Sequence, residues 1–418
     1  MTQRERQGWI LVASLWVILF LIFGGGYNVA GVFVTPLIKQ FGWSRAQVSG
    51  LQSILAVSAG ISAPLIGWLL DRIEARIVMV VGALLAGAAY LGASQVHSYG
   101  PMLAAYLVLG FGIGGATLLP AALVVSNWFK ANRGIALGLT LSGTALGGAG
   151  MTLVANIAIS HHGWRGGYVT LAIPMIVIAI PIMILMVASR PPEARATASA
   201  ADTPTTQPVV ELPGFELGEA SHTRSFWLIC GVNFLYAFIA ASAGLHLIPY
   251  LIGLGYSAAF AARMMSLVLV LAGLGKLVMG AFADRVSARR ALAWNFVAQG
   301  IGILLIFGAA RGAVLVPFVL IFGLSLGAPL VLLPMITVES LGLRRFGSIA
   351  GTSGVFQTVG AAVGPVATGR IFDVMGSYSY AFDLFILSAA AGVVVTLGCL
   401  SLETEQTRLM PAKAVAVA

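Results

Sequence analysis

The chain has 418 residues, of which 59% are hydrophobic and only 9% are charged, and its formal net charge is +9. In a water-soluble globular protein about a quarter of all residues are charged, so this composition excludes an ordinary soluble domain. Apolar stretches of about 20 residues, the length that crosses a bilayer as a helix, recur to the end of the chain. They are continuous and do not alternate with polar residues, which excludes a membrane strand barrel.

We predict that these apolar stretches form twelve membrane-spanning helices. The first follows a short basic start and lacks a small-residue cleavage site, so we interpret it as a retained helix and not as a signal peptide. In chain order the predicted spans cover residues 9–34, 46–70, 77–96, 101–125, 134–158, 167–189, 226–252, 260–283, 290–309, 313–338, 347–370 and 379–401.

One long polar segment separates the first six spans from the last six. It is rich in Pro, Ala, Thr and Glu and cannot build a core of its own. The predicted organisation is an N-terminal six-helix bundle over residues 1–189, a cytoplasmic linker over 190–224, a C-terminal six-helix bundle over 225–403 and a cytoplasmic tail over 404–418.

The basic residues predict the orientation of the chain. Of the 23 Lys and Arg residues, sixteen fall on one predicted side of the membrane, six fall on the other, and Lys276 lies within a span. Cytoplasmic loops carry the excess of Lys and Arg, so we expect both termini in the cytoplasm. We expect the membrane to be the plasma membrane of a bacterium. This placement accounts for the positive charge without a nucleic-acid partner. We expect a monomer in the lipid bilayer with no cofactor, and the five histidines lack the spacing of a metal site.

The two halves repeat each other at an offset of 213 residues. Two separate blocks recur at this one offset, which argues against coincidence. Duplicated bundles around a central substrate site are a recurring transporter design. The matching pairs are Gly67/Gly280, Asp71/Asp284, Arg72/Arg285, Arg76/Arg289, Gly134/Gly347 and Gly138/Gly351.

The repeated G-x-x-x-D-R block, present as GWLLDRIEAR (67–76) and GAFADRVSARR (280–290), resembles the loop signature of the major facilitator superfamily. The first copy has Glu74 where a Gly is common. The resemblance implies an all-α membrane protein with two pseudo-symmetric six-helix bundles. It also implies that the acidic and basic side chains form cytoplasmic salt bridges that hold the outward-facing state. The residues of this expected gate are Asp71, Arg72, Arg76, Asp284, Arg285 and Arg289.

Further stretches are similar to the monocarboxylate transporters and to the bacterial oxalate/formate antiporters. They are GVFVTPLIKQFGWSRAQVSG (31–50), NWFKANRGIALGLTLSGTALGG (127–148), ESLGLRRFGSIAG (339–351) and VGPVATGRIFDVMGSY (363–378). Together they cover predicted spans 1–2, 4–5 and 10–12.

Lys276 is the only ionisable residue in the span between Arg263 and Asp284. At 1.5 Å per helical residue it lies about 12 Å from Asp284, well inside a hydrocarbon layer about 30 Å thick. Burying an ammonium there costs a few kcal/mol or more, so we expect Lys276 to face a wet cavity or an anion. The alternative is snorkelling to the interface, and the depth of Lys276 argues against it.

The resemblance assigns this lysine a role, because in that family a cation in span 8 pairs with the substrate carboxylate. The oxalate/formate antiporters have an Arg there, and the second cation of the oxalate exchangers falls at Gln357 in this chain. One cation favours a monocarboxylate over a dicarboxylate, whose second charge would lack a partner. Gly253 stands where some bacterial relatives have an acid, so proton coupling would use Lys276, His246, the substrate or water.

Other polar side chains within the spans are candidates to complete the pocket, since Tyr and Asn supply hydrogen-bond donors without net charge. For each of them an interhelical hydrogen bond is the alternative. The candidates are Tyr27, Asn28, Thr117, Thr144, Asn233, Tyr236, His246, Tyr250 and Gln357.

These features predict a secondary transporter, not an enzyme, that moves a small organic monocarboxylate by alternating access. The chain has no P-loop, so ATP does not drive it. We favour proton symport over anion exchange, because a lysine without an acidic partner in the membrane loses its proton more easily than a lysine that has one. Two other functions stay open: an exporter of larger amphiphiles such as drugs or siderophores, whose span-4 Arg is replaced here by Tyr106, and a membrane receptor without transport.

Overall fold

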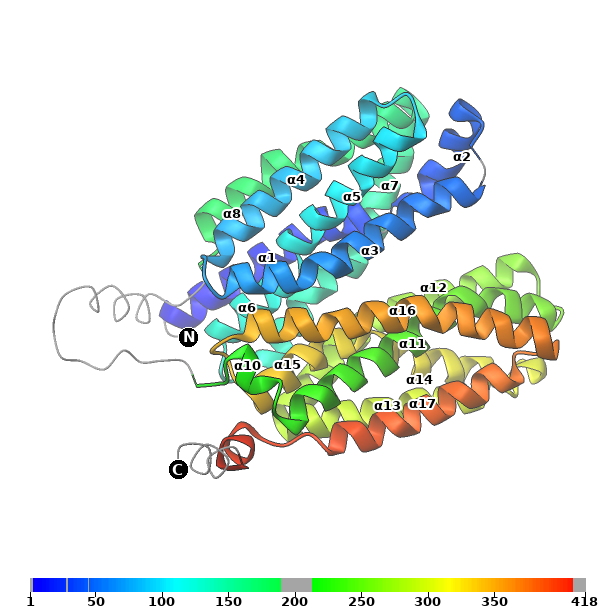
Figure 1. Ribbon diagram of the computed structural model, residues 1–418. Coiled ribbons are helices and arrows are strands. Elements are labelled where there is room, and N and C mark those ends of the chain that lie inside the picture. The colour runs from blue at the N-terminus through cyan, green and yellow to red at the C-terminus, as the bar shows by residue number, and fades with distance from the viewer. Residues whose placement is uncertain (1–2, 28, 44, 189–212, 409–418) are drawn as a thin grey trace. The chain divides into compact units, whose positions relative to one another are not determined.

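The computed structural model describes residues 3–27, 29–43, 45–188 and 213–408, and these are almost entirely helical (Figure 1). By length and composition, eight of the described helices can cross a membrane, or nine if the bent pair Leu315–Gly327 and Pro329–Leu341 forms one span. The expected all-α membrane architecture is confirmed.

The described helices cover most of each of the twelve predicted spans, so the lower number has physical causes. The stretch Arg133–Met186 contains two predicted spans that meet at Gly163, whose φ of 69° breaks the helix. Helix α13 (Ala288–Ile306) carries two arginines and two amides, and α16 (Phe346–Met375) is rich in Gly, Ser and Thr. Neither helix is therefore among the eight that are apolar enough to be counted.

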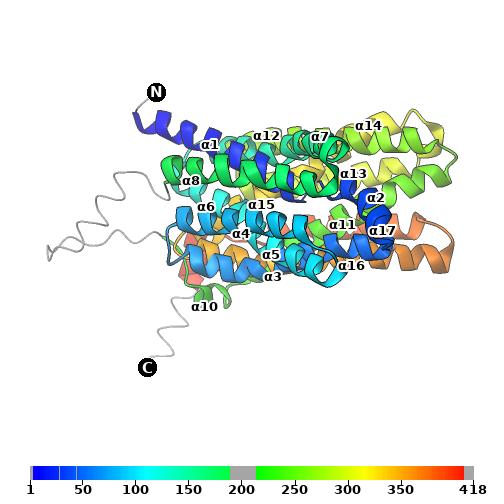
Figure 2. The ribbon, with the colours of Figure 1, turned by 90° about the horizontal axis from the view of Figure 1, so that it is seen from above.

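The chain forms two compact units, and unit 1 comprises residues Met1–Lys130 and Leu139–Leu212. Within unit 1, α3 and α4 lie on either side of α5 (Figure 1, Figure 2). Its elements are α1 (Gln3–Tyr27), α2 (Ala30–Phe41), α3 (Arg45–Leu70), α4 (Ala75–Gln95), α5 (Tyr99–Ala116), α6 (Leu118–Trp128), most of α7 (Arg133–Pro174), the π-helix η1 (Met175–Ala179) and α8 (Ile180–Met186).

Unit 2 comprises residues Ala131–Gly138 and Pro213–Ala418, so it includes the first turns of α7. The predicted domain boundaries assigned those turns to the N-terminal bundle, and they stay a prediction. The other elements of unit 2 are α10 (Leu217–Ala220), α11 (Arg224–Gly253), α12 (Ala258–Val286), α13, the 3-10 helix η3 (Ala309–Arg311), α14 (Leu315–Gly327), α15 (Pro329–Leu341), α16 and α17 (Ser379–Leu397).

The repeat seen in the sequence extends to the helix packing inside each unit. In unit 1, Gly110 of α5 lies against the carbonyl of Leu55 in α3. In unit 2, Gly323 of α14 lies against the carbonyl of Val268 in α12, and both residues are offset by 213 from their counterparts. Glycine allows two helix backbones to approach closely in a membrane. The two units therefore use the same glycine-based crossing.

Candidate substrate site

Lys276 lies in the middle of α12 and is almost fully buried, with 4% of its surface exposed. The helix backbone at this turn packs tightly on both sides. A Cβ added to Gly138 at the start of α7 would lie 2.7 Å from the carbonyl oxygen of Lys276, and Gly275 lies against the backbone of Leu324 in α14. Two glycines thus fix the position of the turn that carries the buried cation.

The end of α14 brings Tyr236 to the same level as this turn. The Tyr236 hydroxyl donates to the carbonyl of Leu326 over 3.3 Å, and Leu326 lies two residues beyond the Leu324 that Gly275 contacts. Asn233, one turn earlier on α11, is buried and donates from Nδ2 to the carbonyl of Ile229 over 2.9 Å. Both predicted side chains therefore carry structural hydrogen bonds as well.

Gln357 is half-buried on α16, the helix that packs most extensively against α11. One turn later, Gly360 lies against the carbonyl of Phe234, next to Asn233. Gly364 likewise lies against Phe238, so the two helices run parallel and Gln357 lies within about one turn of the level of Asn233. Unit 2 thus holds Lys276, Tyr236, Asn233 and Gln357 in the middle parts of three of its helices.

His246 and Tyr250 hold the far end of α11. The His246 Nε2 lies 3.1 Å from the carbonyl of Pro365, and Nδ1 lies 3.2 Å from the Tyr378 hydroxyl. Since a carbonyl only accepts, Nε2 donates to Pro365, and Nδ1 shares a hydrogen bond with the Tyr378 hydroxyl. Burial and the charge of Asp373 raise the pKa of Tyr378, so its hydroxyl stays a donor. Tyr250 donates to the carbonyl of Ile306 over 3.0 Å.

The remaining predicted residues lie in unit 1, except Asn28, which is outside the described residues. Tyr27 ends α1, its ring stacks on Phe23 at 5.3 Å, and its carbonyl accepts from Gln52 over 3.0 Å. The other two are threonines whose hydroxyls donate to backbone carbonyls within their own helical segments. Thr117 donates to Ile113 over 2.6 Å, and Thr144 donates to Leu141 over 2.8 Å.

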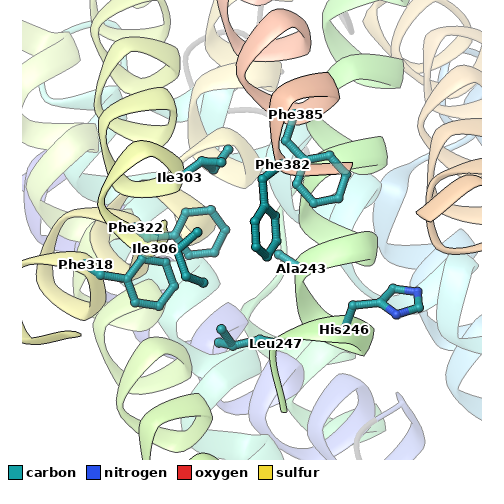
Figure 3. Close-up of a pocket in the computed structure, with 9 residues that line it drawn as sticks. All are labelled: Ala243, His246, Leu247, Ile303, Ile306, Phe318, Phe322, Phe382 and Phe385. Carbon is teal, nitrogen blue, oxygen red and sulfur yellow. The ribbon is translucent and has the colours of Figure 1, made fainter. Parts of the chain in front are cut away.

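A small cavity inside unit 2 is unsuited to an anion (Figure 3). Its volume of about 20 Å³ leaves room for about one water molecule. Its walls are apolar apart from His246, whose ring is turned away from the phenylalanine rings in Figure 3. The lining residues are Ala243, His246, Leu247, Ile303, Ile306, Phe318, Phe322, Phe382 and Phe385.

Asp284, one of the predicted gate residues, caps the start of α7. Its Oδ1 accepts from the backbone N–H of Gly134 over 2.7 Å, and its Oδ2 accepts from that of Ile135 over 3.0 Å. A helix start exposes unpaired N–H groups and the positive end of the helix dipole, so a carboxylate is favourable there. We expected salt bridges for this aspartate, and the described contact is a helix cap.

The other gate residues have separate contacts. Arg72 lies over the Trp68 ring at 3.9 Å, and Arg76 pairs with Glu74 at 3.2 Å. Arg289 donates to the carbonyl of Cys399 over 3.0 Å, while Arg285 is exposed. The sequence did not indicate these partners, because each depends on how loops and helix ends fold back.

Sequence reasoning also missed a buried tyrosine cluster in unit 1. Tyr90 donates to the carbonyl of Gly25 over 2.7 Å, just before α1 ends. The hydroxyls of Tyr106 and Tyr168 lie 2.9 Å apart, and the Phe33 ring stacks on Tyr168 at 4.1 Å. The signal available was the occurrence of single tyrosines in the middle of apolar spans.

Known proteins resemble this chain over nearly all of its length. The monocarboxylate transporter 13 of Rattus norvegicus is 24% identical over 412 residues, which cover 96% of this chain and 92% of the relative. The crystal structure of FucP, a transporter in its outward conformation, matches with a TM-score of 0.69 at 16% identity and covers 94% of this chain and 99% of that one. The proton:xylose symporter XylE matches with a TM-score of 0.71 at 14% identity and covers 94% and 95%. At such identities the structures show the fold alone.

The family model described as "Major Facilitator Superfamily" matches residues 15–365, which is most of the chain. It spans the repeated G-x-x-x-D-R blocks, the buried Lys276 and nearly all of the helices of both units. Together with the fold shared with FucP and XylE, this match shows a multi-pass membrane transporter. The chain belongs to the major facilitator superfamily.

Proposed function

We propose that this protein is a secondary transporter that carries a small organic monocarboxylate by alternating access. The observation that carries the proposal is Lys276. Among the charged side chains that the structure describes, only Lys276 (4% exposed) and Glu405 (2% exposed) are almost fully buried. Glu405 accepts from the N–H of Ser225 at a helix start over 2.9 Å, whereas Lys276 lies in mid-helix, where an organic anion suits it.

The number of charges supports a substrate with one carboxylate. A dicarboxylate needs a second counter-charge, and the position that matches the second cation of oxalate exchangers is the neutral, half-buried Gln357. The relative named monocarboxylate transporter 13 agrees with this class. No specific observation favours the alternative of an exporter of larger amphiphiles.

In this proposal Lys276 binds the carboxylate and neutral polar groups complete the pocket. Tyr27, Asn28 and Gln357 are the strongest of these, since the hydroxyls of Thr117, Thr144, Tyr236 and Tyr250 donate to backbone carbonyls. We place the protein in a bacterial plasma membrane as a monomer with both termini in the cytoplasm, and we favour proton symport over exchange.

Uptake into proteoliposomes tests the proposal. Labelled lactate and pyruvate are offered with competing acetate, oxalate, malonate and the neutral lactamide. We expect competition by monocarboxylates only, and a loss of uptake of at least about tenfold in Lys276→Gln, which corresponds to about 1.4 kcal/mol. Arg263→Gln, which removes an exposed cation from the same helix, is the matched control and should transport normally.

Two outcomes would contradict the proposal. Uptake at the wild-type rate in Lys276→Gln would show that the lysine does not bind the substrate. Competition by bulky amphiphiles but not by small carboxylates would favour the exporter.

A further inference from the structure

Two amide side chains inside unit 2 have no hydrogen-bond partner. Asn295 and Gln299 of α13 are 1% and 0% exposed. In the part of the chain that the structure describes, neither the oxygen nor the nitrogen of either amide makes a hydrogen bond. Buried polar side chains almost always have a partner, so four such atoms on neighbouring turns of one helix point to a polar ligand.

Helix geometry places the two amides at the level of the bend between α14 and α15. Gly302 of α13 packs against α14 so closely that an added Cβ would lie 2.8 Å from the Cβ of Phe322. Since α13 and α14 are consecutive antiparallel helices, one turn back along α13 places Gln299 opposite Ser325. A further turn places Asn295 opposite Pro329.

The backbone at this bend lacks part of its regular hydrogen bonding. The axes of α14 and α15 differ by 42°. Pro329 has no N–H to donate to the carbonyl of Ser325, four residues earlier. The next carbonyl, that of Leu326, accepts from the Tyr236 hydroxyl over 3.3 Å. Polar backbone groups and two unpaired amides therefore gather in one buried region.

The matching crossing in unit 1, between α4 and α5, has no polar side chains at these two positions. At the offset of 213 residues, Gly82 and Ala86 of α4 match Asn295 and Gln299. A Cβ added to Gly82 would lie 2.7 Å from both the Gly112 carbonyl oxygen and the Ala116 nitrogen. The crossing in unit 1 is closed by direct backbone contact at these positions, whereas the same positions in unit 2 carry two buried amides.

We propose that Asn295 and Gln299 hold ordered water against the α14–α15 bend. Each amide presents N–H donors and an oxygen acceptor, so its ligand must both accept and donate. A cation would leave the N–H groups unmatched, and an anion would leave the oxygens unmatched. Water does both, and internal waters in proteins typically make about three such hydrogen bonds.

The bound water would allow the angle between α14 and α15 to change. A helix bends where water inserts into its hydrogen-bond ladder, because the water replaces the bonds that bending would break. Gly327, the last residue of α14, packs against the backbone of Ala272, one turn before Lys276. The hydrated bend thus lies at the level of the buried cation, where α14 and α15 can change their angle without exposing unpaired backbone groups.

Radiolytic hydroxyl labelling tests for this water, because radicals formed at a bound water oxidise the side chains next to it. The reporter is Leu292→Met, a conservative change at a buried site one turn from Asn295. Its built-in reference is Met79, which is 0% exposed and occupies the same repeat position in unit 1. We expect oxidation at position 292 to be several-fold faster than at Met79.

Adding Asn295→Leu and Gln299→Leu to the reporter should remove this difference, because an apolar crossing holds no water. Size-exclusion chromatography and thermal unfolding check that this protein is folded. If it does not fold, the ratio between position 292 and Met79 in the single reporter protein decides. Equal oxidation of the two methionines in that protein, or fast oxidation that persists after both amides are replaced, would overturn the proposal.

Discussion

At the scale of single residues, the two almost fully buried charges of the described structure, Lys276 and Glu405, have different surroundings. Glu405 accepts from the backbone N–H of Ser225 over 2.9 Å and from its hydroxyl over 2.6 Å, so the start of α11 compensates its charge. Lys276 lies in mid-helix, away from any helix terminus, and in our proposal the substrate carboxylate is the mobile counter-charge that a transport cycle loads and releases. Its position therefore suits a binding role more than a structural one.

A second cation beside the pocket should change the substrate. We expect Gln357→Arg to make oxalate and malonate effective competitors of labelled lactate, because the added guanidinium can pair with the second carboxylate. Thr358→Arg, at the neighbouring half-buried position of α16, is the matched control. Half-maximal inhibitory concentrations measured in proteoliposomes should fall by about tenfold or more in the first variant only. Equal inhibition in both variants would show that the charge acts from a distance.

Individual site residues could be predicted only where the residue type is improbable in its setting. Lys276 stands out in the sequence because it is one ionisable residue in an apolar span, and the structure places it in the interior of α12. Asn295 and Gln299 did not stand out, because an amide in a span usually finds a partner on a neighbouring helix. Their lack of a partner depends on the spacing between α13 and the α14–α15 bend, which no local pattern contains.

At the scale of helices, the start of α7 depends on Asp284 of α12. The carboxylate accepts from two N–H groups, whereas the amide of Asp284→Asn offers one oxygen and no charge. The lost cap and dipole interactions are worth about 0.5–2 kcal/mol. We expect this substitution, and Asp71→Asn at the repeat position, to weaken the outward-facing state and to expose a Gln357→Cys reporter to a cytoplasmic maleimide.

The labelling experiment needs a background in which Cys230 and Cys399, both buried, are replaced by Ala. Asp373→Asn removes an exposed carboxylate from α16 and serves as the control. Labelling at the unmodified rate in both the Asp71 and the Asp284 variants would argue against a gate at these residues.

A second element-scale prediction concerns the contact between α7 and α12. The Cβ of Gly138→Ala would lie 2.7 Å from the Lys276 carbonyl oxygen, so one of the two helices must move. We expect a loss of about 1–3 kcal/mol of unfolding free energy, seen as a lower melting temperature, together with weaker substrate binding. Gly92→Ala on α4, where an added Cβ meets nothing within 4 Å, should leave both quantities unchanged or slightly raise stability. A Gly138→Ala protein as stable as the Gly92→Ala protein would show that α12 tolerates the shift.

The helices themselves were readily predicted, since an apolar stretch of membrane-spanning length has few other structures available. The breaks within them were not. Hydropathy cannot show that α5 ends at Ala116 and α6 begins at Leu118, nor that Arg133–Met186 turns at Gly163. These breaks depend on backbone dihedrals, the φ of −122° and ψ of −106° at Thr117 and the φ of 69° at Gly163.

At the scale of the whole molecule, the two repeats share their scaffold and differ in their polar interior. The glycine crossings of α3 with α5 and of α12 with α14 occupy matching positions. The position that matches Lys276 is Ala63, and the positions that match Asn295 and Gln299 are Gly82 and Ala86. The matching positions of unit 1 thus carry neither the buried cation nor the two amides, so the substrate charge in our proposal is bound by one half of a duplicated framework.

Coupling follows from what happens to the Lys276 charge when the substrate leaves. An empty carrier that keeps the proton would have to take a bare charge through a closed, poorly solvated state, which is costly. If the empty lysine releases its proton, one proton and one carboxylate move together and the loaded and empty carriers are both neutral at this site. We therefore expect liposomes without internal substrate to accumulate labelled lactate when the outside is acidified, with uptake rising as external pH falls. Lys276→Arg should retain exchange of external for internal lactate and lose this net uptake, because a guanidinium stays protonated in proteins. Uptake by the unmodified protein only after preloading with a carboxylate would instead make it an obligate exchanger.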